Sequence, residues 1–257
     1  MPDIYDCEVL ENEIIAEDSK AFVAHSVAFK CKELARDVRA GQFLHIKCGD
    51  ERILRRPFSV CSVCGDTVKF VFEVKGKGTH WLSCVKQGDS LDILGPLGNG
   101  FDIPEGQIVV VGGGLGVPPM LFASSTSRSC VTAILGFRDA GRVMLVDDFK
   151  AVCDKVYLTT DDGSAGIHGL VTTPLEEILK TGVHDAVLAC GQLGMMKGVA
   201  DLCMRYRIPC QVSLEERMGC GVGACLVCVC ATKSEKETQM SRVCKDGPVF
   251  SAERVAW

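Results

Sequence analysis

The feature that most constrains this chain is a set of four cysteines near its end. Cys220, Cys225 and Cys228 follow the spacing C-x4-C-x2-C, and Cys244 lies further along the chain. This is the plant-type spacing in which four thiolates hold a [2Fe-2S] cluster. Glycines alternate with other residues between the first two cysteines, which favours a tightly folded loop whose backbone N–H groups point at sulfur. The pattern therefore predicts a metal cluster bound by these four residues.

Other interpretations of the cysteines fit less well. A zinc site more often shows paired C-x2-C units, and the tail holds one such unit. Buried structural thiols behave as small apolar groups and would not need the interleaved glycines. Cys230 competes as a ligand because it lies two residues after Cys228 and shares its face on a strand. The count C-x4-C-x2-C selects Cys228, so we predict that Cys230 belongs to the core.

Composition limits the class of protein. The chain has 257 residues, of which 47% are hydrophobic and 24% are charged, as in a folded soluble protein. This length suffices for one large or two ordinary domains plus a small appendage. A net charge of −5 disfavours nucleic acid as a partner. The opening segment is acidic and lacks an apolar core, so we expect no signal peptide. The sequence has no long apolar run, so we expect no membrane span. With sixteen cysteines, these features predict a reducing, cytoplasmic location.

The first hundred residues alternate apolar and polar positions in short β-rich runs separated by turn residues. This pattern predicts a small antiparallel barrel. The clearest strand candidates cover residues 21–29, 43–48, 68–74 and 90–94, and one short helix is predicted over 79–86.

Two segments of this region suit an anionic cofactor. Arg56 precedes the rigid Pro57 on an extended segment, and its planar guanidinium suits a pyrophosphate. Ser59 is placed to hydrogen-bond a flavin ring. Gly78 and Thr79 open the predicted helix, whose free N–H groups suit the same pyrophosphate. Taken singly, the arginine is as well explained by solvation and the glycines by a hairpin turn, whereas their order along the chain strengthens the prediction.

After residue 101 the pattern changes to alternating strands and helices. Residues 107–111 form an apolar run typical of a strand covered on both faces of a parallel sheet. A glycine-rich loop and a helical run follow, which predicts a dinucleotide phosphate site. The loop glycines are Gly112, Gly113, Gly114 and Gly116. Val117 stands where the third glycine of the Rossmann fingerprint would fall, and a tight turn without a ligand is the alternative.

Further strand candidates cover residues 131–135, 155–159, 186–189 and 209–213, with helices at 173–180 and 194–206. This alternation predicts a doubly wound sheet of about five strands, whose ligands bind at the carboxyl ends of the strands. Cys190 follows one strand and is either a nucleotide-site residue or a buried thiol. Asp161 and Asp162 follow another, where loop solvation and capping explain them. The five histidines show no metal-ligand spacing.

The segments Arg56-Pro-x-Ser59, Gly78-Thr79 and Gly-Gly-Gly-x-Gly-x-x-Pro, in this order, resemble the ferredoxin-reductase superfamily. The resemblance implies that FAD contacts the first segment and that NAD lies on the glycine loop. It assigns to FAD the residues Arg56, Pro57, Phe58, Ser59, Val71, Phe72, Glu73, Gly78 and Thr79. It places Cys190 against the nicotinamide, although Gln192 replaces the proline usual in that loop.

The tail around Glu215–Cys228 and Cys244–Phe250 resembles one branch, the electron-transfer subunits of NAD-dependent dihydroorotate dehydrogenases. The resemblance covers essentially the whole chain. It implies a catalytic partner that oxidises dihydroorotate at its FMN in pyrimidine biosynthesis and passes electrons through the [2Fe-2S] cluster and FAD to NAD. It further implies a heterotetramer with two copies of each subunit and no substrate site on this chain.

The expected fold is therefore α+β with several domains. Residues 1–101 form an antiparallel β-barrel for FAD, residues 102–213 an α/β doubly wound domain for NAD, and residues 214–257 a small β-rich [2Fe-2S] subdomain. One alternative is the small subunit of a bifurcating ferredoxin:NADP or sulfide-type oxidoreductase, in whose relatives an aspartate can replace one cysteine ligand. Another is a redox sensor without catalysis. The direction of electron flow and the choice between NAD and NADP stay open.

Overall fold

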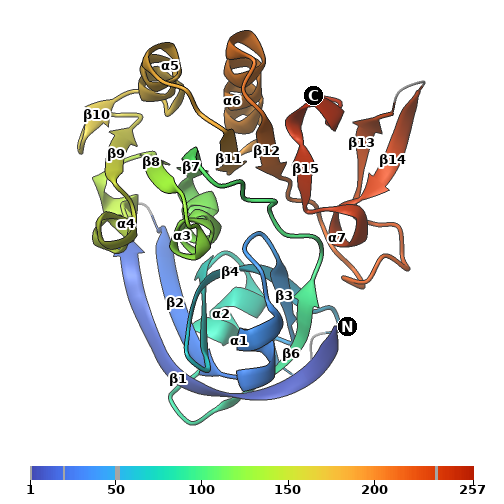
Figure 1. The fold of residues 1–257 in the computed structure, drawn as a ribbon. Helices are drawn as coiled ribbons and strands as arrows, with labels where there is room; N and C mark the ends of the chain where they lie inside the picture. The colour runs from blue at the N-terminus through green and yellow to red at the C-terminus, as the bar shows by residue number, and fades with distance from the viewer. Residues whose placement is uncertain (1, 20, 50–52, 235–236) are drawn as a thin grey trace.

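The computed structural model describes residues 2–19, 21–49, 53–234 and 237–257. The chain builds a barrel first, an α/β layer above it and a small tail beside both (Figure 1). This arrangement confirms the predicted fold class. In the described ranges, no helix combines the length and the apolar character needed to cross a membrane.

The barrel closes with the strand order β1-β2-β5-β4-β3-β6, and all neighbouring strands are antiparallel. Its strands are β1 (Asp3–Glu17), β2 (Val23–Lys30), β3 (Phe43–Ile46), β4 (Arg56–Cys64), β5 (Thr67–Glu73) and β6 (Ser90–Leu97), with helices α1 (Lys32–Asp37) and α2 (Lys77–Ser83). β1 is long rather than one of the short runs expected. It bends at two bulges and pairs with β2 and β6, so this single strand closes the barrel (Figure 1).

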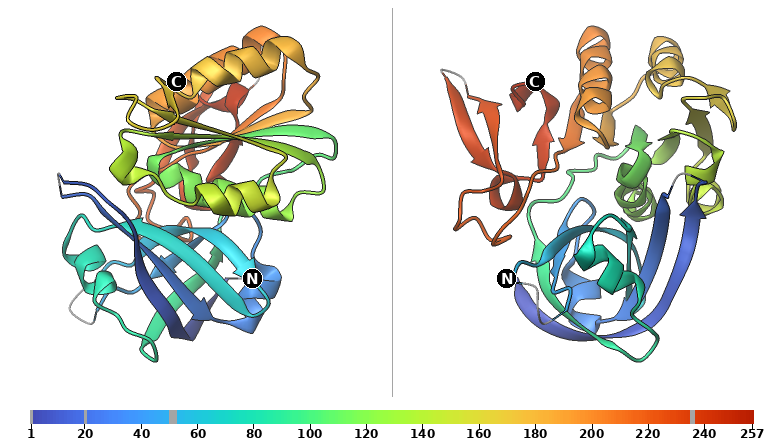
Figure 2. Two further views of the ribbon diagram at one scale, coloured as in Figure 1. Left: turned by 90° about the vertical axis from the view of Figure 1, so that its left-hand side faces the viewer. Right: turned by 180° about the vertical axis from the view of Figure 1, so that it is seen from behind.

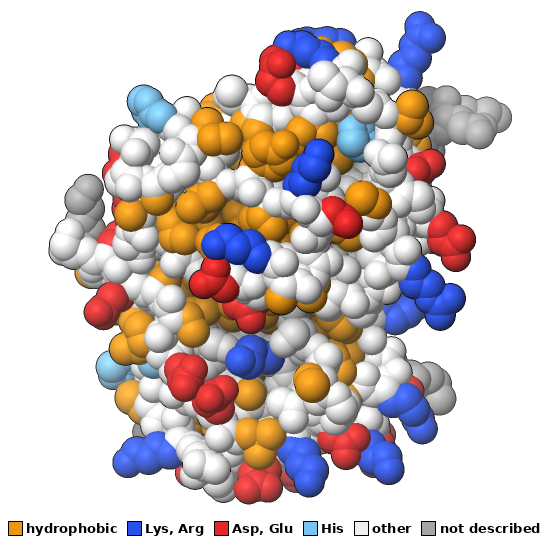
Figure 3. All heavy atoms as spheres, turned by 60° about the vertical axis from the view of Figure 1, so that its left-hand side comes forward, with side chains coloured by type: hydrophobic (Ala, Val, Ile, Leu, Met, Phe, Trp, Pro, Cys, Tyr) orange, Lys and Arg blue, Asp and Glu red, His pale blue; other side chains and the backbone are white. Residues whose placement is uncertain are grey.

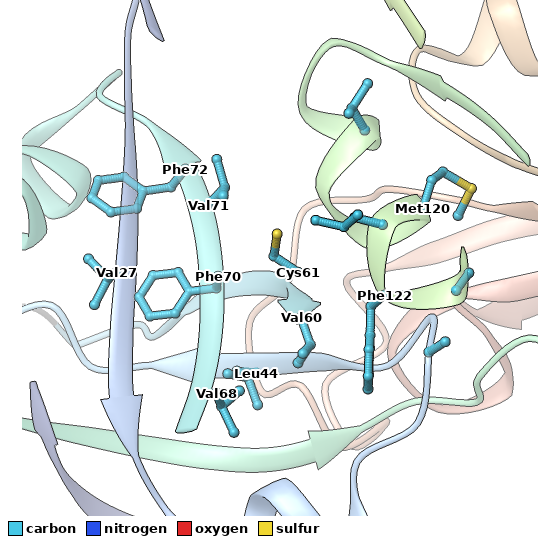
Figure 4. Packing of buried hydrophobic residues seen from close by; sticks show 14 of the residues in the cluster. Val27, Leu44, Val60, Cys61, Val68, Phe70, Val71, Phe72, Met120 and Phe122 are labelled. Atoms are coloured by element: carbon cyan, nitrogen blue, oxygen red, sulfur yellow. The ribbon is translucent and has the colours of Figure 1, made fainter. Parts of the chain in front are cut away.

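The barrel interior is filled by alternate side chains of its strands. Val68, Phe70 and Phe72 of β5 point to the same side because strand side chains alternate, and they meet Val27 and Leu44 inside the barrel (Figure 4). The same core continues through Val60 and Cys61 of β4 to Phe122 of helix α3 (Val117–Thr126) (Figure 4). The barrel and the α/β layer therefore share one core.

The α/β layer is a seven-stranded sheet in the order β10-β9-β8-β7-β11-β12-β15, parallel except for the last pair. The five predicted strands form its centre. The strands are β7 (Gln107–Gly113), β8 (Cys130–Phe137), β9 (Lys155–Thr160), β10 (Ile167–His168), β11 (Ala186–Cys190), β12 (Cys210–Ser213) and β15 (Val249–Ser251).

Helices cover both faces of this sheet. Those facing the barrel are α3 (Val117–Thr126) and α4 (Val146–Val152), whereas α5 (Thr172–Thr181) and α6 (Leu193–Tyr206) lie on the far face (Figure 2). Short 3-10 helices are η1 (Gly114–Gly116), η2 (Ala140–Arg142) and η3 (Ala252–Arg254). On one face of the molecule, acidic and basic side chains are interspersed rather than separated by sign (Figure 3).

The tail contains a two-stranded sheet, β13 (Val229–Lys233) with β14 (Thr238–Arg242), and the short helix α7 (Val243–Asp246). These strands flank the polar hairpin predicted over 232–238, of which residues 235–236 lie outside the described residues. β15 then pairs antiparallel with β12, which extends the nucleotide sheet by one strand. The backbone N–H of Asn99 donates to the carbonyl of Gly247 over 2.6 Å. The tail is thus bonded to both other domains.

Candidate functional site

The cluster loop places Cys220 and Cys225 against each other. The backbone N–H groups of Ala224 and Cys225 donate to the Cys220 sulfur over 3.2 and 3.4 Å, and the N–H of Cys220 donates to the Cys225 sulfur over 3.4 Å. Gly221 and Gly223 have φ values of +73° and +83°, in the left-handed region that favours glycine. The glycines therefore do what the sequence predicts, because they let the loop turn its N–H groups onto sulfur.

Cys228 and Cys244 form a second pair, in which the N–H of Cys244 donates to the Cys228 sulfur over 3.4 Å. Both side chains are buried, whereas Cys225 is exposed. Within the described part of the chain, no group of three or more His, Cys, Asp or Glu side chains is arranged to hold a single metal ion. Two pairs of thiols suit a dinuclear cluster, in which two ligands bind each iron. The donor set and its grouping fit a [2Fe-2S] cluster.

The thiols differ in acidity. Burial raises the pKa of Cys220, but hydrogen bonds from the backbone N–H groups of Cys225, Val222 and Ala224 outweigh it and lower that pKa to about 6. Burial and the neighbouring Cys228 thiol raise the pKa of Cys244 to about 12. The thiolate is the form of cysteine that binds metal. The lowered pKa therefore favours the metal-binding form of Cys220 in the metal-free chain.

Cys230 lies outside both pairs. It is half-buried on β13, packs against the core that contains Cys228 and Cys244, and has a pKa raised by burial. This position agrees with the prediction that it is a packing residue.

On the barrel, the structure brings together the two segments predicted to hold a pyrophosphate. A Cβ added at Gly78 would lie 3.2 Å from Nε of Arg56 and 3.5 Å from Cβ of Cys48. A larger residue at Gly78 would therefore crowd the Arg56 side chain, whereas its contact with Cys48 would be ordinary. Thr79 caps its own helix, since its hydroxyl accepts the N–H groups of Lys75 and Gly76 over 2.8 and 3.1 Å.

The two adjacent arginines have different surroundings. Arg55 donates to the carbonyls of His45 and Asp92 over 3.2 and 2.9 Å and pairs with the Asp92 carboxylate at 2.6 Å. It therefore ties β3 to β6. Arg56 donates to the carbonyl of Leu54 over 2.7 Å and lies beside Gly78, which leaves Arg56 as the arginine placed for an anion.

The remaining predicted flavin residues line two adjacent strands. In β4, Arg56, Pro57, Phe58 and Ser59 are half-buried, and the Phe58 ring stacks on Phe70 with centroids 5.2 Å apart. In β5, the side chains of Val71 and Phe72 are buried and Glu73 pairs with Lys75 at 2.8 Å. Contact between a flavin and Val71 or Phe72 would therefore use the backbone rather than the buried side chains.

The structure also brings together the two segments predicted to hold NAD. Strands β7 and β11 are adjacent and place Gly112 opposite Cys190. A Cβ added at Gly113 would overlap the Met195 sulfur, and one at Gly116 would overlap the carbonyl of Cys190. Gly114 has a φ of +55°. Glycine is required here because the loop packs directly against the end of the neighbouring strand.

Cys190 itself is half-buried, and burial raises its pKa to about 12. It is a neutral thiol that shapes the loop. Asp162 accepts the backbone N–H and the hydroxyl of Ser164 over 2.9 and 2.6 Å, so it stabilises its own loop rather than capping a helix.

His45 is a buried polar residue to which the sequence assigns no role. It is 1% exposed, and neither ring nitrogen has a hydrogen-bond partner. A Cβ added at Gly221 would lie 2.6 Å from its Nδ1. Burial and the nearby Arg55 and Arg56 lower its pKa to about 4. The only signal in the sequence was a histidine on a barrel strand, which by itself indicates no role.

A closed barrel with Arg56 beside the Gly78 turn, a doubly wound sheet with a glycine loop and a tail with two thiol pairs define a flavin- and NAD-dependent iron–sulfur reductase. Residues 215–256 match the family model described as the iron–sulfur cluster binding domain of dihydroorotate dehydrogenase B. The chain belongs to the family of dihydroorotate dehydrogenase B (NAD+) electron transfer subunits.

Relatives in this family align over most of the chain. The electron transfer subunit of Caldanaerobacter subterraneus is 40% identical over 249 residues, which cover 96% of each chain. That of Clostridium perfringens is 42% identical over 221 residues, or 83% of this chain and 85% of the relative. A solved structure of NADH-dependent reduced ferredoxin-NADP oxidoreductase is 32% identical with a TM-score of 0.85, covering 98% of this chain and 90% of that one. Ferredoxin-NADP+ reductase of Plasmodium falciparum shares the fold alone, with a TM-score of 0.62 and 13% identity over 82% of this chain and 96% of that one.

Proposed function

We propose that this chain is the electron-transfer subunit of an NAD-linked dihydroorotate dehydrogenase in pyrimidine biosynthesis. The observation that carries the proposal is the structure of the tail. Its two thiol pairs suit a dinuclear cluster, and its backbone is hydrogen-bonded to both the flavin barrel and the nucleotide sheet. In the overall reaction, dihydroorotate loses two electrons and two protons at an FMN-containing partner. NAD+ accepts both electrons and one proton as a hydride, and the other proton goes to solvent.

Bound FAD would link two kinds of electron transfer, because the cluster carries one electron at a time whereas nicotinamide accepts two together. The residues of this chain bind and orient the groups. Arg56 and the Gly78 turn hold the FAD pyrophosphate, with Ser59 near the flavin ring. The glycine loop from Gly112 to Gly116 holds the NAD phosphates, and Cys190 lies beside the nicotinamide. Cys220 with Cys225, and Cys228 with Cys244, hold the cluster.

The three functional regions are residues 1–101 for FAD, 102–213 for NAD and 214–257 for the cluster. These regions differ in function but do not pack as separate bodies. The barrel and the nucleotide domain share a core, and β15 of the tail belongs to the nucleotide sheet. This sharing supports a fixed spacing between the three groups.

The cluster loop is the proposed docking surface for the catalytic partner. Val222, Leu226 and Val227 are 44%, 62% and 55% exposed, and they flank the exposed Cys225. Apolar side chains gathered in this way mark interaction sites. A partner that covers them would meet the cluster at its most exposed ligand, and we propose an assembly with two copies of each subunit.

We infer a cytoplasmic location from the thiols. All sixteen cysteines are free, and a reducing compartment keeps thiols in this state.

A second candidate function is that of a bifurcating ferredoxin:NADP reductase subunit, which the similarity to the NADH-dependent reduced ferredoxin-NADP oxidoreductase favours. The identity of 40% to dihydroorotate dehydrogenase B subunits over 96% of the chain supports the first proposal over this one.

The test is to produce the chain with and without a catalytic dihydroorotate dehydrogenase subunit. We expect one FAD and one [2Fe-2S] signal per chain, and NAD+ reduction by dihydroorotate only in the complex. A chain that binds neither flavin nor cluster contradicts the proposal. Reduction of NADP+ with ferredoxin, and none with dihydroorotate, selects the second candidate. A cluster without NADH-dependent dye reduction indicates a redox sensor.

A further inference from the structure

Strand β3 is buried on both faces, which is unusual for a barrel wall. Leu44 and Ile46 belong to the barrel core, whereas Phe43 belongs to the other core, together with Cys228 and Cys244 of the tail. His45 shares the face of Phe43, because side chains two apart on a strand point the same way. The tail therefore covers the outer face of β3, and His45 is the polar side chain enclosed there.

On one side, the His45 ring contacts the cluster loop. Its Nδ1 faces Gly221, the residue after the ligand Cys220, so closely that an added Cβ would lie 2.6 Å from this nitrogen. Gly221 also has a φ of +73°. Both facts require glycine at this position, and the turn that begins the cluster loop rests directly on the imidazole.

On the other side, His45 pairs with β4, one of the two strands that carry the proposed flavin residues. In the antiparallel register of β3 and β4, His45 lies opposite Pro57, and Ile46 lies opposite Arg56. The His45 carbonyl accepts a hydrogen bond from Arg55 over 3.2 Å. One residue thus touches both the flavin-binding segment and the cluster loop.

Both ring nitrogens lack a hydrogen-bond partner at 1% exposure. Buried polar groups are nearly always paired, and an exception calls for an explanation such as a redox role. The backbones of Arg55 and Cys220 both lie near the ring without reaching hydrogen-bond geometry. Of the two, Cys220 is a proposed cluster ligand.

We propose that His45 is a positioning residue for electron transfer between flavin and cluster. In the loaded protein its ring N–H bonds the Cys220 backbone, which holds the start of the cluster loop against the flavin strand. An N–H donated beside Cys220 would also stabilise the reduced form of the cluster, since hydrogen bonds and dipoles around the ligands set the potential of such clusters. This inference rests on the proposed function and adds a residue to it.

The experiment compares His45→Phe, His45→Gln and wild type in the complete complex with its catalytic partner. Phe preserves an apolar ring in the cavity, whereas Gln preserves a side-chain N–H. His168→Gln, on the exposed edge strand β10, is the control. EPR-monitored titration measures the midpoint potential of the cluster, and rapid mixing with NADH measures how fast reduced flavin reduces it.

We expect His45→Phe to keep its FAD, to shift the cluster to lower potential and to slow cluster reduction, with the flavin potential unchanged. His45→Gln should recover part of both effects, and His168→Gln should match wild type. Gly221→Ala should shift the potential in the same direction. Gly221→Ala should shift the potential less in a His45→Ala background than in wild type, because the added Cβ then no longer clashes with the imidazole ring.

Wild-type potential and rate in His45→Phe overturn the inference while leaving the proposed function intact. If His45→Phe fails to load iron, the His45→Gln variant decides. A cluster potential near that of wild type in His45→Gln supports the role of the N–H, whereas loss of the cluster in His45→Gln as well overturns it. A wild-type complex without FAD or cluster refutes the proposed function instead.

Discussion

The backbone N–H of Cys244 lies 3.4 Å from the Cys228 sulfur, although the two residues are sixteen positions apart. Helix α7 creates this contact, because Cys244 lies in its first turn and the carbonyl of Cys228 accepts the N–H of Val243 over 2.8 Å. Two consecutive backbone N–H groups thus bring the fourth thiol to Cys228, one by donating to its carbonyl and the other by donating to its sulfur.

The first prediction concerns this pair. Cys244→Ser should abolish or strongly weaken the cluster, because one iron loses a thiolate. Cys230→Ser, which changes a half-buried thiol outside the pairs, should retain it. Iron and sulfide content with the EPR signal measure the outcome. A cluster retained in Cys244→Ser and lost in Cys230→Ser would show that Cys230 is the ligand.

A second prediction separates the two adjacent arginines. Arg56→Ala should lower FAD affinity with little change in stability, because Arg56 lies at the Gly78 turn. Arg55→Ala should lower the free energy of unfolding by about 2 kcal/mol, because it removes two hydrogen bonds to backbone carbonyls of β3 and β6 and the ion pair with Asp92. Flavin content and denaturant unfolding distinguish them. Equal FAD loss in both variants, at unchanged stability, would contradict the assignment.

A third prediction tests the nucleotide loop with two glycines. Gly116→Ala forces a Cβ onto the carbonyl of Cys190, and overpacking of this kind costs about 1–3 kcal/mol. We expect weaker NADH binding, measured by titration, with FAD content unchanged. Gly194→Ala is the matched control, because nothing lies within 4 Å of its added Cβ. NADH affinity that is equal in the two variants would argue against this loop as the NAD site.

A fourth prediction concerns the docking surface. Leu226→Glu and Val227→Glu should each prevent copurification of the catalytic partner, because a carboxylate would be buried without a partner. Cluster and flavin should remain, since both side chains are more than half exposed. Val183→Glu, at an 83% exposed position before β11, is the control. Normal assembly of both loop variants would place the interface elsewhere.

A fifth prediction follows from thiol acidity in the metal-free chain. With its pKa lowered to about 6, Cys220 is mostly thiolate at pH 7, and this fraction falls as the pH drops through 6. Cys244, with a pKa raised to about 12, stays protonated across this range. Mass spectrometry after brief alkylation at pH 7 should find Cys220 modified before Cys244, with a rate that declines below pH 6. Preferential labelling of Cys244 would contradict the loop geometry.

Local chemistry made much of this protein predictable. The cluster motif lies within one loop, because Cys220, Cys225, Cys228 and the glycines between them are close together in the chain. It can therefore be recognised without knowing the rest of the fold. The same holds for the apolar run of β7 and the glycine loop after it. Strand alternation also predicted the barrel, but it indicated short runs where the long β1 closes the barrel through two bulges.

By itself, the sequence determined the cofactor classes and the order of barrel, nucleotide sheet and tail, and it predicts the cluster ligands, because each depends on residues close together in the chain. Only the tertiary structure decided which of these segments meet. Barrel closure brings Arg56 to Gly78, parallel pairing of β7 and β11 sets the glycine loop against Cys190, and the tail buries the outer face of β3. The burial of His45 depends on that last contact, since an alternating strand pattern alone would leave its outer face in water.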